Sequence, residues 1–465
     1  MAKVTSYGAA QTVTGSCHLV TINSVQILID CGMFQGDGGS ERNYEPFEFD
    51  PAKVQYLVLT HAHLDHIGRV AKLVKEGFHG EIIATQPTHD IAKVMLLDSA
   101  GILKEEYKTL RRKARRRGEE ETVCEPLYTE EHVHQVFSKK WHTLEYFEHH
   151  KLRQHIRVSL GNAGHIMGSA FVILDYHEES VPKRIVFSGD IGSPNRLIID
   201  SADRLDKTDA LFVESTYGDR NHKPMRESIA EFKKAVVETL EHDGNVLIPS
   251  FALERTQEIL WLLHEMYEDG ELPKCHVFLD SPLAIKATKL YNKYPIHLSE
   301  ELEFHASIGR DPFSFEWLET TSTRDQSLAI NSVKKRAIII AGSGMCTGGR
   351  IMHHLKHRLW NPKNTVVFVG YQVEGTLGRR IIEGAKFVKI YGEEIITNAQ
   401  VYTINGFSAH ADQNDLIDWI RPVKELKTLC LIHGETEKME LFAKAIKETL
   451  DLDAHIMERG VSVTL

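Results

Sequence analysis

Runs of apolar residues that end in metal-binding side chains recur along this chain. The clearest run is residues 54–59, whose continuous apolar character predicts a buried strand. Thr60 ends the run, and the next six residues, 61–66, hold three imidazoles and one carboxylate. Apolar positions after Gly68 then follow helical spacing. The pattern therefore predicts a strand that leads into a helix through a turn rich in metal-binding side chains.

The spacing of the ligands within this turn indicates more than one metal ion. His61 and His63 lie two positions apart, so on extended backbone both side chains point to one side. Asp65 and His66 follow the bend and can face a second point in space. A catalytic zinc ion usually takes about three protein ligands and one water. Four such groups in so short a stretch therefore indicate half of a two-metal site.

Other polar residues lie at or beside the ends of predicted strands further along. His165 lies in a glycine-rich turn before one strand, and Asp190 and Glu214 each end an apolar strand. His410 and His433 lie at strand ends near the C-terminus. We expect these side chains to gather at one edge of a sheet. A carboxylate such as that of Asp190 can bridge two cations because it offers two oxygens.

The chain organisation changes near Tyr217. From there to about Gly384 helices alternate with strands, which predicts a parallel α/β domain of about 170 residues, with an irregular stretch at 294–330. This part contains no H-x-H motif, so it is not a second copy of the first part. After Gly392 the first domain is predicted to resume. The predicted boundaries are 1–216 and 393–465 for the first domain and 217–392 for the inserted one.

Composition narrows the class of protein. The 465 residues are too many for one ordinary core. The net charge of −10 does not indicate a general nucleic-acid binder, so any nucleic acid would have to be held in a local basic groove. The six cysteines show no CxxC spacing, which argues against a zinc–thiolate cluster and a disulfide scaffold. We expect no signal peptide, because the first residues lack an apolar core, and no apolar run is long enough to span a membrane. We therefore expect a cytoplasmic protein with no membrane partner.

Two further stretches carry charge or histidine without a clear site. In the charged segment 104–121, six of the seven residues 111–117 are basic. We interpret the segment as a solvated helix, and a phosphate-contacting patch is the alternative. Residues 122–160 are predicted to be helix and connector, with histidines that lie at the surface or in packing. These are His132, His134, His142, His149, His150 and His155.

The full set of motifs is similar to one known family. H-x-H-x-D-H after a buried strand resembles the second motif of the metallo-β-lactamase superfamily, and Asp30, His165 and Asp190 match its other motifs. Glu214 in ESTYG, His410 in FSAHAD and His433 in HGE resemble the β-CASP branch, which includes RNA-processing nucleases such as RNase J and the cleavage-and-polyadenylation nuclease. The resemblance implies an α/β fold, a metallo-β-lactamase αββα sandwich with an inserted parallel α/β (β-CASP) domain. A histidine at position 433 resembles the RNA-processing members rather than the DNA-processing ones.

The resemblance also implies roles for individual residues. It implies two Zn²⁺ per chain, with Asp190 bridging them and Asp30 orienting the histidines from behind. His410 is expected to act as general acid, positioned by Glu214, and Asp65 is expected to act in catalysis as well as in metal binding. The implied ligands of one zinc are His61, His63 and His165, and those of the other are Asp65, His66 and His433.

Two stretches resemble phosphate-contacting parts of bacterial and archaeal members. AGSGMCTGGRIMHHL (341–355) follows a strand and opens a helix, where backbone amides and the helix N-terminus favour an anion. FALERTQE (251–258) resembles a stretch whose arginine lies along the RNA groove. The residues expected to contact phosphate are Ser343, Gly344, Thr347, Gly348, Gly349, Arg350, Arg255 and Arg379.

The function expected from this resemblance is hydrolysis of single-stranded RNA by a water activated between two metals, leaving 5′-phosphate and 3′-hydroxyl ends. Endonuclease and 5′-exonuclease action both remain open, and a homodimer fits the family. One alternative is a small-molecule metallo-hydrolase of the thioesterase or lactonase type. A second is a catalytically inactive RNA-binding scaffold, although scaffold relatives have lost metal ligands that this chain retains.

Overall fold

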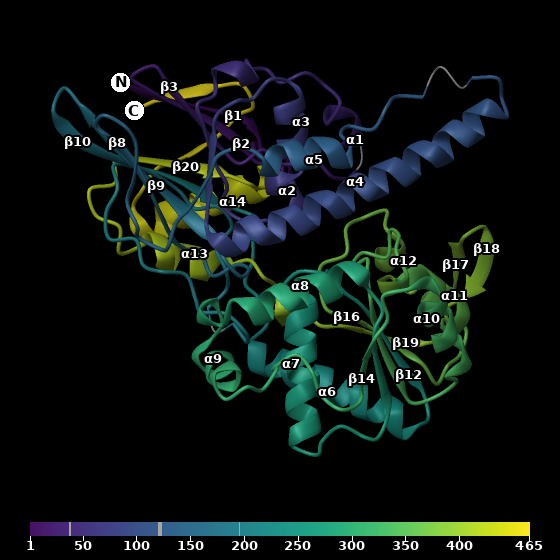
Figure 1. The fold of residues 1–465 in the computed structure, drawn as a ribbon. Helices are drawn as coiled ribbons and strands as arrows, with labels where there is room; N and C mark the ends of the chain where they lie inside the picture. The colour runs from purple at the N-terminus through teal and green to yellow at the C-terminus, as the bar shows by residue number, and fades with distance from the viewer. Residues whose placement is uncertain (37–38, 120–122, 195) are drawn as a thin grey trace. The chain divides into compact units, whose positions relative to one another are not determined.

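The computed structural model describes residues 1–36, 39–119, 123–194 and 196–465, which form two compact units (Figure 1). Unit 1 contains residues 1–194, 201–221 and 410–465, and unit 2 contains 195–200 and 222–409. Unit 2 is therefore inserted into unit 1, as the sequence predicts.

Unit 1 contains two seven-stranded sheets, each of mixed parallel and antiparallel strands. The first has the order β22-β1-β2-β3-β4-β5-β6 and the second the order β21-β20-β11-β10-β9-β8-β7. The first sheet consists of β1 (Ala2–Gly8), β2 (Cys17–Ile22), β3 (Val25–Ile29), β4 (Tyr56–Val58), β5 (Glu81–Ala84), β6 (Trp141–Thr143) and β22 (Ser462–Thr464). The second consists of β7 (His150–Arg153), β8 (Ile156–Asn162), β9 (Ala170–Glu178), β10 (Val181–Phe187), β11 (Ala210–Glu214), β20 (Thr428–Ile432) and β21 (Ala454–Ile456).

The two sheets share one apolar core. Val4 and Val58 from the first sheet and Val172 and Phe212 from the second are fully buried in one cluster, so the sheets pack face to face. A second cluster packs α13 (Gln413–Ile420) and α14 (Thr436–Leu450) against the outer face of the second sheet. Figure 1 shows the remaining helices beside the first sheet: α1 (Gly39–Arg42), α2 (Leu64–Ile67), α3 (Val70–Lys75), α4 (Gln86–Arg115) and α5 (Glu130–Phe137). The layers are those of an αββα sandwich.

Unit 2 confirms the predicted parallel α/β domain. The six strands of its main sheet are all parallel, in the order β14-β13-β15-β12-β16-β19. The strands are β12 (Asn245–Pro249), β13 (His276–Leu279), β14 (Leu318–Thr320), β15 (Ala337–Ala341), β16 (Thr365–Phe368) and β19 (Gln400–Thr403), with a separate hairpin of β17 (Phe387–Ile390) and β18 (Glu393–Ile396). The helices are α6 (Met225–Glu241), α7 (Arg255–Glu268), α8 (Pro282–Lys293), α9 (Glu300–Ser307), α10 (Arg324–Ala329), α11 (Ile351–Arg358) and α12 (Leu377–Ile382).

The structure differs from the predicted end of the insert. Residues 393–409 lie in unit 2 rather than in the resumed first domain. β18 pairs with β17, and β19 adds to the insert's sheet beside β16. The apolar pattern of these short strands fits either sheet, and only the pairing partner decides between them. The stretch 294–330, predicted to be irregular, contains α9, α10 and the edge strand β14.

Residues 122–160 also differ from the prediction. The described part, 123–160, contains α5, as expected, but also β6, β7 and the first part of β8, whereas Thr122 lies outside the described residues. β6 and β7 are three and four residues long and lie at sheet edges, where polar side chains interrupt the apolar pattern.

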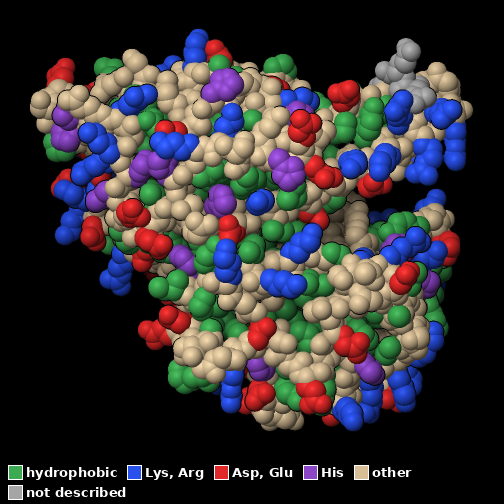
Figure 2. All heavy atoms as spheres, viewed as in Figure 1, with side chains coloured by type: hydrophobic (Ala, Val, Ile, Leu, Met, Phe, Trp, Pro, Cys, Tyr) green, Lys and Arg blue, Asp and Glu red, His purple; other side chains and the backbone are tan. Residues whose placement is uncertain are grey.

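The basic segment continues α4 as a solvated helix, in agreement with the interpretation of its sequence. Its Lys and Arg residues between 111 and 117 are exposed, and Figure 2 shows basic side chains over the outer end of α4. Lys108 pairs with Glu105 at 2.6 Å on the same helix. Glu120 and Glu121, at the end of the segment, lie outside the described residues. Within the described chain, no helix is both long and apolar enough to cross a membrane.

Candidate metal centre

The predicted ligands come together in unit 1 because the strands that carry them end at the same edges. β3 and β4 are parallel neighbours, and Asp30 and His61 follow their C-terminal ends. β10, β11 and β20 are also parallel neighbours, and Asp190, Glu214 and His433 lie at or just beyond their ends. Parallel strands present their carboxyl ends at one edge, which is where residues distant in sequence can meet.

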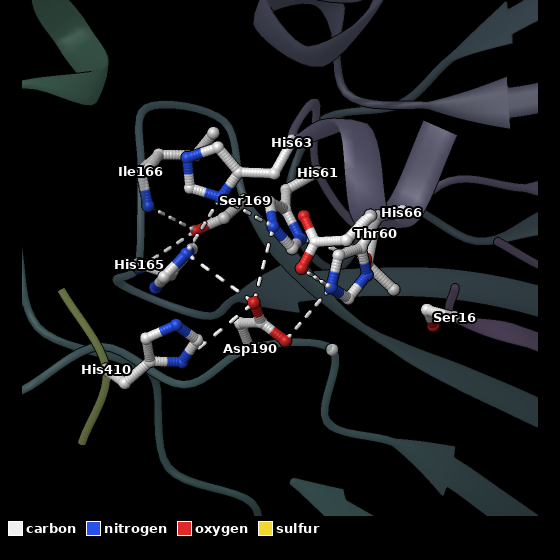
Figure 3. Close-up of polar contacts among 12 residues, drawn as sticks. Ser16, Thr60, His61, His63, His66, His165, Ile166, Ser169, Asp190 and His410 are labelled. Atoms are coloured by element: carbon white, nitrogen blue, oxygen red, sulfur yellow. Dashed lines mark hydrogen bonds and ion pairs between the residues drawn. The ribbon is translucent and has the colours of Figure 1, made fainter. Parts of the chain in front are cut away.

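The first group of ligand atoms comes from His61, His63, His165 and Asp190 (Figure 3). The His63 Nδ1 atom lies 3.1 Å from Nε2 of His61 and 3.1 Å from Nε2 of His165. Asp190 Oδ2 lies 3.5 Å from His61 Nε2 and 3.6 Å from His165 Nε2. Ligand atoms of a tetrahedral zinc with bonds of about 2.0–2.1 Å are separated by about 3.3–3.4 Å. The four atoms are therefore spaced as the ligands of one such ion.

The second group contains Asp65, His66 and His433. The Nε2 atoms of His66 and His433 are 3.2 Å apart, and Asp65 Oδ2 lies 3.6 Å from His433 Nε2 and 3.9 Å from His66 Nε2. α2 begins at Leu64, directly after His63. This helical turn carries Asp65 and His66 away from the direction of His61 and His63. The start of the helix therefore separates His61 and His63 from Asp65 and His66.

Asp190 lies between the two groups. Its Oδ2 atom faces His61 and His165, whereas its Oδ1 atom lies 3.2 Å from His66 Nε2 and 3.7 Å from His433 Nε2. Asp190 is 2% exposed, and among the described residues Oδ1 makes no hydrogen bond of good geometry. A buried carboxylate oxygen without a hydrogen bond is costly unless a cation satisfies it. The residues present therefore fit a pair of divalent ions bridged by Asp190.

The protonation of the first group suits metal binding. Burial, together with the neighbouring His66, lowers the pKa of His61 well below its usual range. Burial lowers the pKa of His63 to about 4. Both rings are therefore neutral at neutral pH and offer a nitrogen lone pair, which is the form that binds metal.

His410 and Glu214 form a pair beside the first group. His410 Nδ1 lies 3.2 Å from each oxygen of the Glu214 carboxylate and 3.9 Å from Asp190 Oδ2. Glu214 is fully buried and also accepts a hydrogen bond from the backbone N–H of Ile191 at 2.7 Å, which fixes its orientation. Burial alone would lower the pKa of His410, but Glu214 and Asp190 outweigh burial and raise that pKa to about 9. The imidazole is therefore held charged, with a proton to give.

Comparisons with family models cover most of the chain. Residues 11–151 match the metallo-beta-lactamase superfamily, 256–381 match the Beta-Casp domain, and 394–457 match the Zn-dependent metallo-hydrolase RNA specificity domain. The chain is 39% identical to Ribonuclease TTHA0252 of Thermus thermophilus over 96% of both chains. This chain belongs to the β-CASP branch of the metallo-β-lactamase superfamily. It is a metal-dependent hydrolase, as the resemblance of its motifs implies.

Two other comparisons match this chain to a more distant relative and to a solved structure. The chain is 31% identical to Transcription termination factor FttA of Methanocaldococcus jannaschii, over 98% of this chain and 70% of that one. A solved structure of a protein of unknown function from Enterococcus faecalis matches over 100% of both chains, with a TM-score of 0.57 and 14% identity. This second match supports the fold alone.

Sequence reasoning missed two threonines that support the β-CASP metal centre. The Thr60 side chain bonds to the Asp30 carboxylate at 2.9 Å and lies 3.1 Å from His61 Nδ1. The Thr216 hydroxyl lies 3.0 Å from His433 Nδ1. Thr60 lies directly before His61, and Thr216 lies within the ESTYG motif, two residues after Glu214. Partners of this kind fix which ring nitrogen faces the metal.

Asp30 takes the orienting position that its motif predicts. It is buried, its Oδ2 atom lies 2.7 Å from His66 Nδ1, and its Oδ1 atom accepts the Thr60 backbone N–H at 2.8 Å. Nδ1–H of His66 can therefore donate to Asp30, which leaves Nε2 with its lone pair toward the second group.

Asp30→Asn is expected to weaken zinc binding at the second group by about 10–100-fold, because the new amide N–H₂ would face the N–H of His66. Equilibrium dialysis against buffered zinc measures this. Asp30 has a φ of 59°, which asparagine also tolerates, so the backbone is not strained. Asp451→Asn is the matched control, since Asp451 has a φ of 55° and is exposed. Equal zinc affinity in the two variants would contradict the orienting role.

The predicted phosphate contacts lie in the β-CASP insert, and the structure gives several of them partners within the protein. The Arg350 guanidinium donates to Asp280 Oδ1 at 2.7 Å and to the Thr321 carbonyl at 2.8 Å. Arg255 is 5% exposed and pairs with Glu258. Arg379 is half-buried and pairs with Glu383 at 2.7 Å. Contact of these arginines with phosphate stays a prediction.

The glycine-rich stretch forms a closed turn. The backbone N–H of Thr347 donates to the Ser343 side chain at 3.0 Å, and the N–H of Ser343 donates to the Gly348 carbonyl at 3.3 Å. Gly349 has a φ of +71°, and a Cβ there would lie 2.3 Å from the Gly342 carbonyl oxygen, so this position requires glycine. The phosphate role of the turn, including that of Gly344, stays a prediction.

Proposed function

We propose that this protein is a zinc-dependent ribonuclease that hydrolyses RNA phosphodiesters with two zinc ions per chain, leaving 5′-phosphate and 3′-hydroxyl ends. The observation that carries the proposal is the position of Asp190, whose two oxygens face two separate groups of ligands. RNA as the substrate is supported by the similarity to Ribonuclease TTHA0252 over nearly the whole chain. It is also supported by the match to an RNA specificity domain at 394–457.

Different side chains of this centre have different roles in hydrolysis. Two divalent cations bound by these residues would lower the pKa of a water and neutralise charge on the phosphate. Asp65 and Asp190 would complete the two ligand sets. His410 gives its proton to the 3′ oxygen of the departing ribose, and Glu214 keeps the ring oriented for that transfer.

The predicted products follow from which bond breaks. Water supplies the oxygen that attacks phosphorus, the bond from phosphorus to the 3′ oxygen breaks, and that oxygen leaves with the proton of His410. The phosphate therefore stays on the 5′ side of the downstream fragment, and the neighbouring 2′-hydroxyl is not consumed.

The test is cleavage of single-stranded RNA labelled at either end, with and without a chelator. We expect cleavage that zinc restores after chelation, and fragments that carry 5′-phosphate and 3′-hydroxyl ends. A single 2′-deoxy substitution at a cleavage position should still allow cleavage there. A 2′,3′-cyclic phosphate product would contradict the proposed chemistry, and turnover of a thioester without RNA cleavage would favour the small-molecule alternative.

Transcription termination is a second candidate, because the archaeal relative named FttA from Methanocaldococcus jannaschii is 31% identical to this chain over the matched part. About 30% of that relative lies outside the match. The same RNA assay decides whether this chain has the hydrolytic activity by itself. Cleavage of labelled RNA by this chain in the absence of transcription proteins would support the ribonuclease proposal and would add nothing in favour of transcription termination.

A further inference from the structure

A second cluster of metal-binding side chains lies outside the centre described above. Glu81, His142 and His150 each place one ligand atom within 4.8 Å of the other two. His142 Nε2 lies 2.8 Å from Glu81 Oε2, and the two imidazole rings lie with their centroids 4.1 Å apart. From the sequence, both histidines are interpreted as surface or packing residues, since nothing in their spacing along the chain suggests a site.

The cluster joins the edges of the two sheets. His142 lies on β6, the outermost strand of the first sheet, and Glu81 lies on the neighbouring strand β5. His150 begins β7, the outermost strand of the second sheet. Residues 144–149 connect the two edges directly. A cation held by these three side chains would therefore link the two sheets of the sandwich where each sheet ends.

The charges of the three groups suit a divalent cation. The Lys140 ammonium lies 2.9 Å from Glu81 Oε1 and lowers the pKa of that carboxyl, so Glu81 is ionised at neutral pH. Lys140 occupies only one oxygen, and Oε2 faces His142. Burial and the neighbouring His142 lower the pKa of His150, so this ring carries a lone pair. An incoming ion would replace the hydrogen bond between His142 Nε2 and Glu81 Oε2.

We propose that Glu81, His142 and His150 form a zinc site that clips together the edges of the two sheets. All three side chains are half-buried, so the fourth position of a tetrahedral zinc would be open to water, as in other sites with three protein ligands. Imidazole and carboxylate suit zinc among the common cellular divalent ions, whereas magnesium and calcium prefer oxygen ligands alone. The role of this zinc is stabilisation of the sandwich by binding the folded state.

The test is the zinc content of the purified chain after dialysis against buffered free zinc, measured for wild type and His150→Ala. We expect wild type to hold one zinc per chain more than the variant. We expect the thermal midpoint of wild type to rise further with zinc than that of the variant, while RNA cleavage stays equal. His149→Ala is the matched control, since His149 is exposed, adjacent and outside the cluster, and it should behave as wild type.

Glu81→Gln provides a second variant that keeps the shape of the side chain. It should also lose one zinc per chain, and circular dichroism should match wild type. Equal zinc content in wild type, His150→Ala and Glu81→Gln would overturn the proposal, because the cluster would then hold no ion. Loss of more than one zinc in folded His150→Ala would also overturn it, because the effect would then have reached the centre around Asp190.

Discussion

Asp190→Asn is expected to reduce RNA cleavage by about 10⁴-fold or more and to remove at least one zinc ion per chain. The carboxylate is the shared member of both ligand groups, and removing one member of a unit removes the function of the whole unit. The amide keeps the volume of the side chain, but it offers one oxygen instead of two. Its N–H₂ group would face either His61 and His165 or His66 and His433. Zinc content and single-turnover cleavage of labelled RNA measure the two effects.

Asp175→Asn is a suitable control for this substitution. Asp175 lies on β9, in the same sheet as the strand that precedes Asp190, and it pairs with Arg184 at 2.7 Å rather than with a histidine. This variant should keep both its zinc and its activity. An Asp190→Asn protein that retained wild-type zinc would show that the carboxylate does not bridge the ions, even if cleavage were lost.

The candidate centre could be predicted from the sequence because most of its residues lie at or near the ends of apolar strands. An apolar run indicates a buried strand, and a polar residue directly after the run indicates the end of that strand at the edge of a sheet. The alternation of helices and strands in the second domain was equally clear. Its strands β12, β13, β15 and β16 are largely buried on both faces, so each forms a mostly apolar segment of the sequence. The family resemblance then supplied an expectation that the pattern could not give, namely the assignment of each residue to one of two ions.

Features that depend on pairing between distant segments were not predictable. Residues 400–403 carry no signal that β16 is their partner, so the insert was ended too early. His142 and His150 lie eight positions apart, and only the meeting of two sheet edges brings them together with Glu81. The sequence also does not show that Arg350 contacts buried Asp280, at the end of another strand, and contact of Arg350 with phosphate stays a prediction.

His410→Ala is expected to retain both zinc ions while RNA cleavage slows by roughly 10²–10⁴-fold, the usual contribution of a general acid. Retention follows from the geometry, because the closest contact of His410 Nδ1 is with Glu214 at 3.2 Å, whereas Asp190 lies at 3.9 Å. Zinc analysis and single-turnover kinetics measure the two properties. Loss of zinc in this variant would make His410 a ligand and would contradict its assignment as acid.

The leaving group of the substrate separates acid catalysis from a general disturbance of the centre. A ribose oxygen leaves poorly without a proton, whereas a nitrophenolate leaves readily as the anion. On a nitrophenyl phosphodiester, His410→Ala should therefore come close to the wild-type rate, while Asp190→Asn should remain inactive. Glu214→Gln should follow the pattern of His410→Ala more weakly, because it keeps the ring in place but loses the charge that holds its proton. An equal loss on both substrates in His410→Ala would assign His410 to positioning of the phosphate instead.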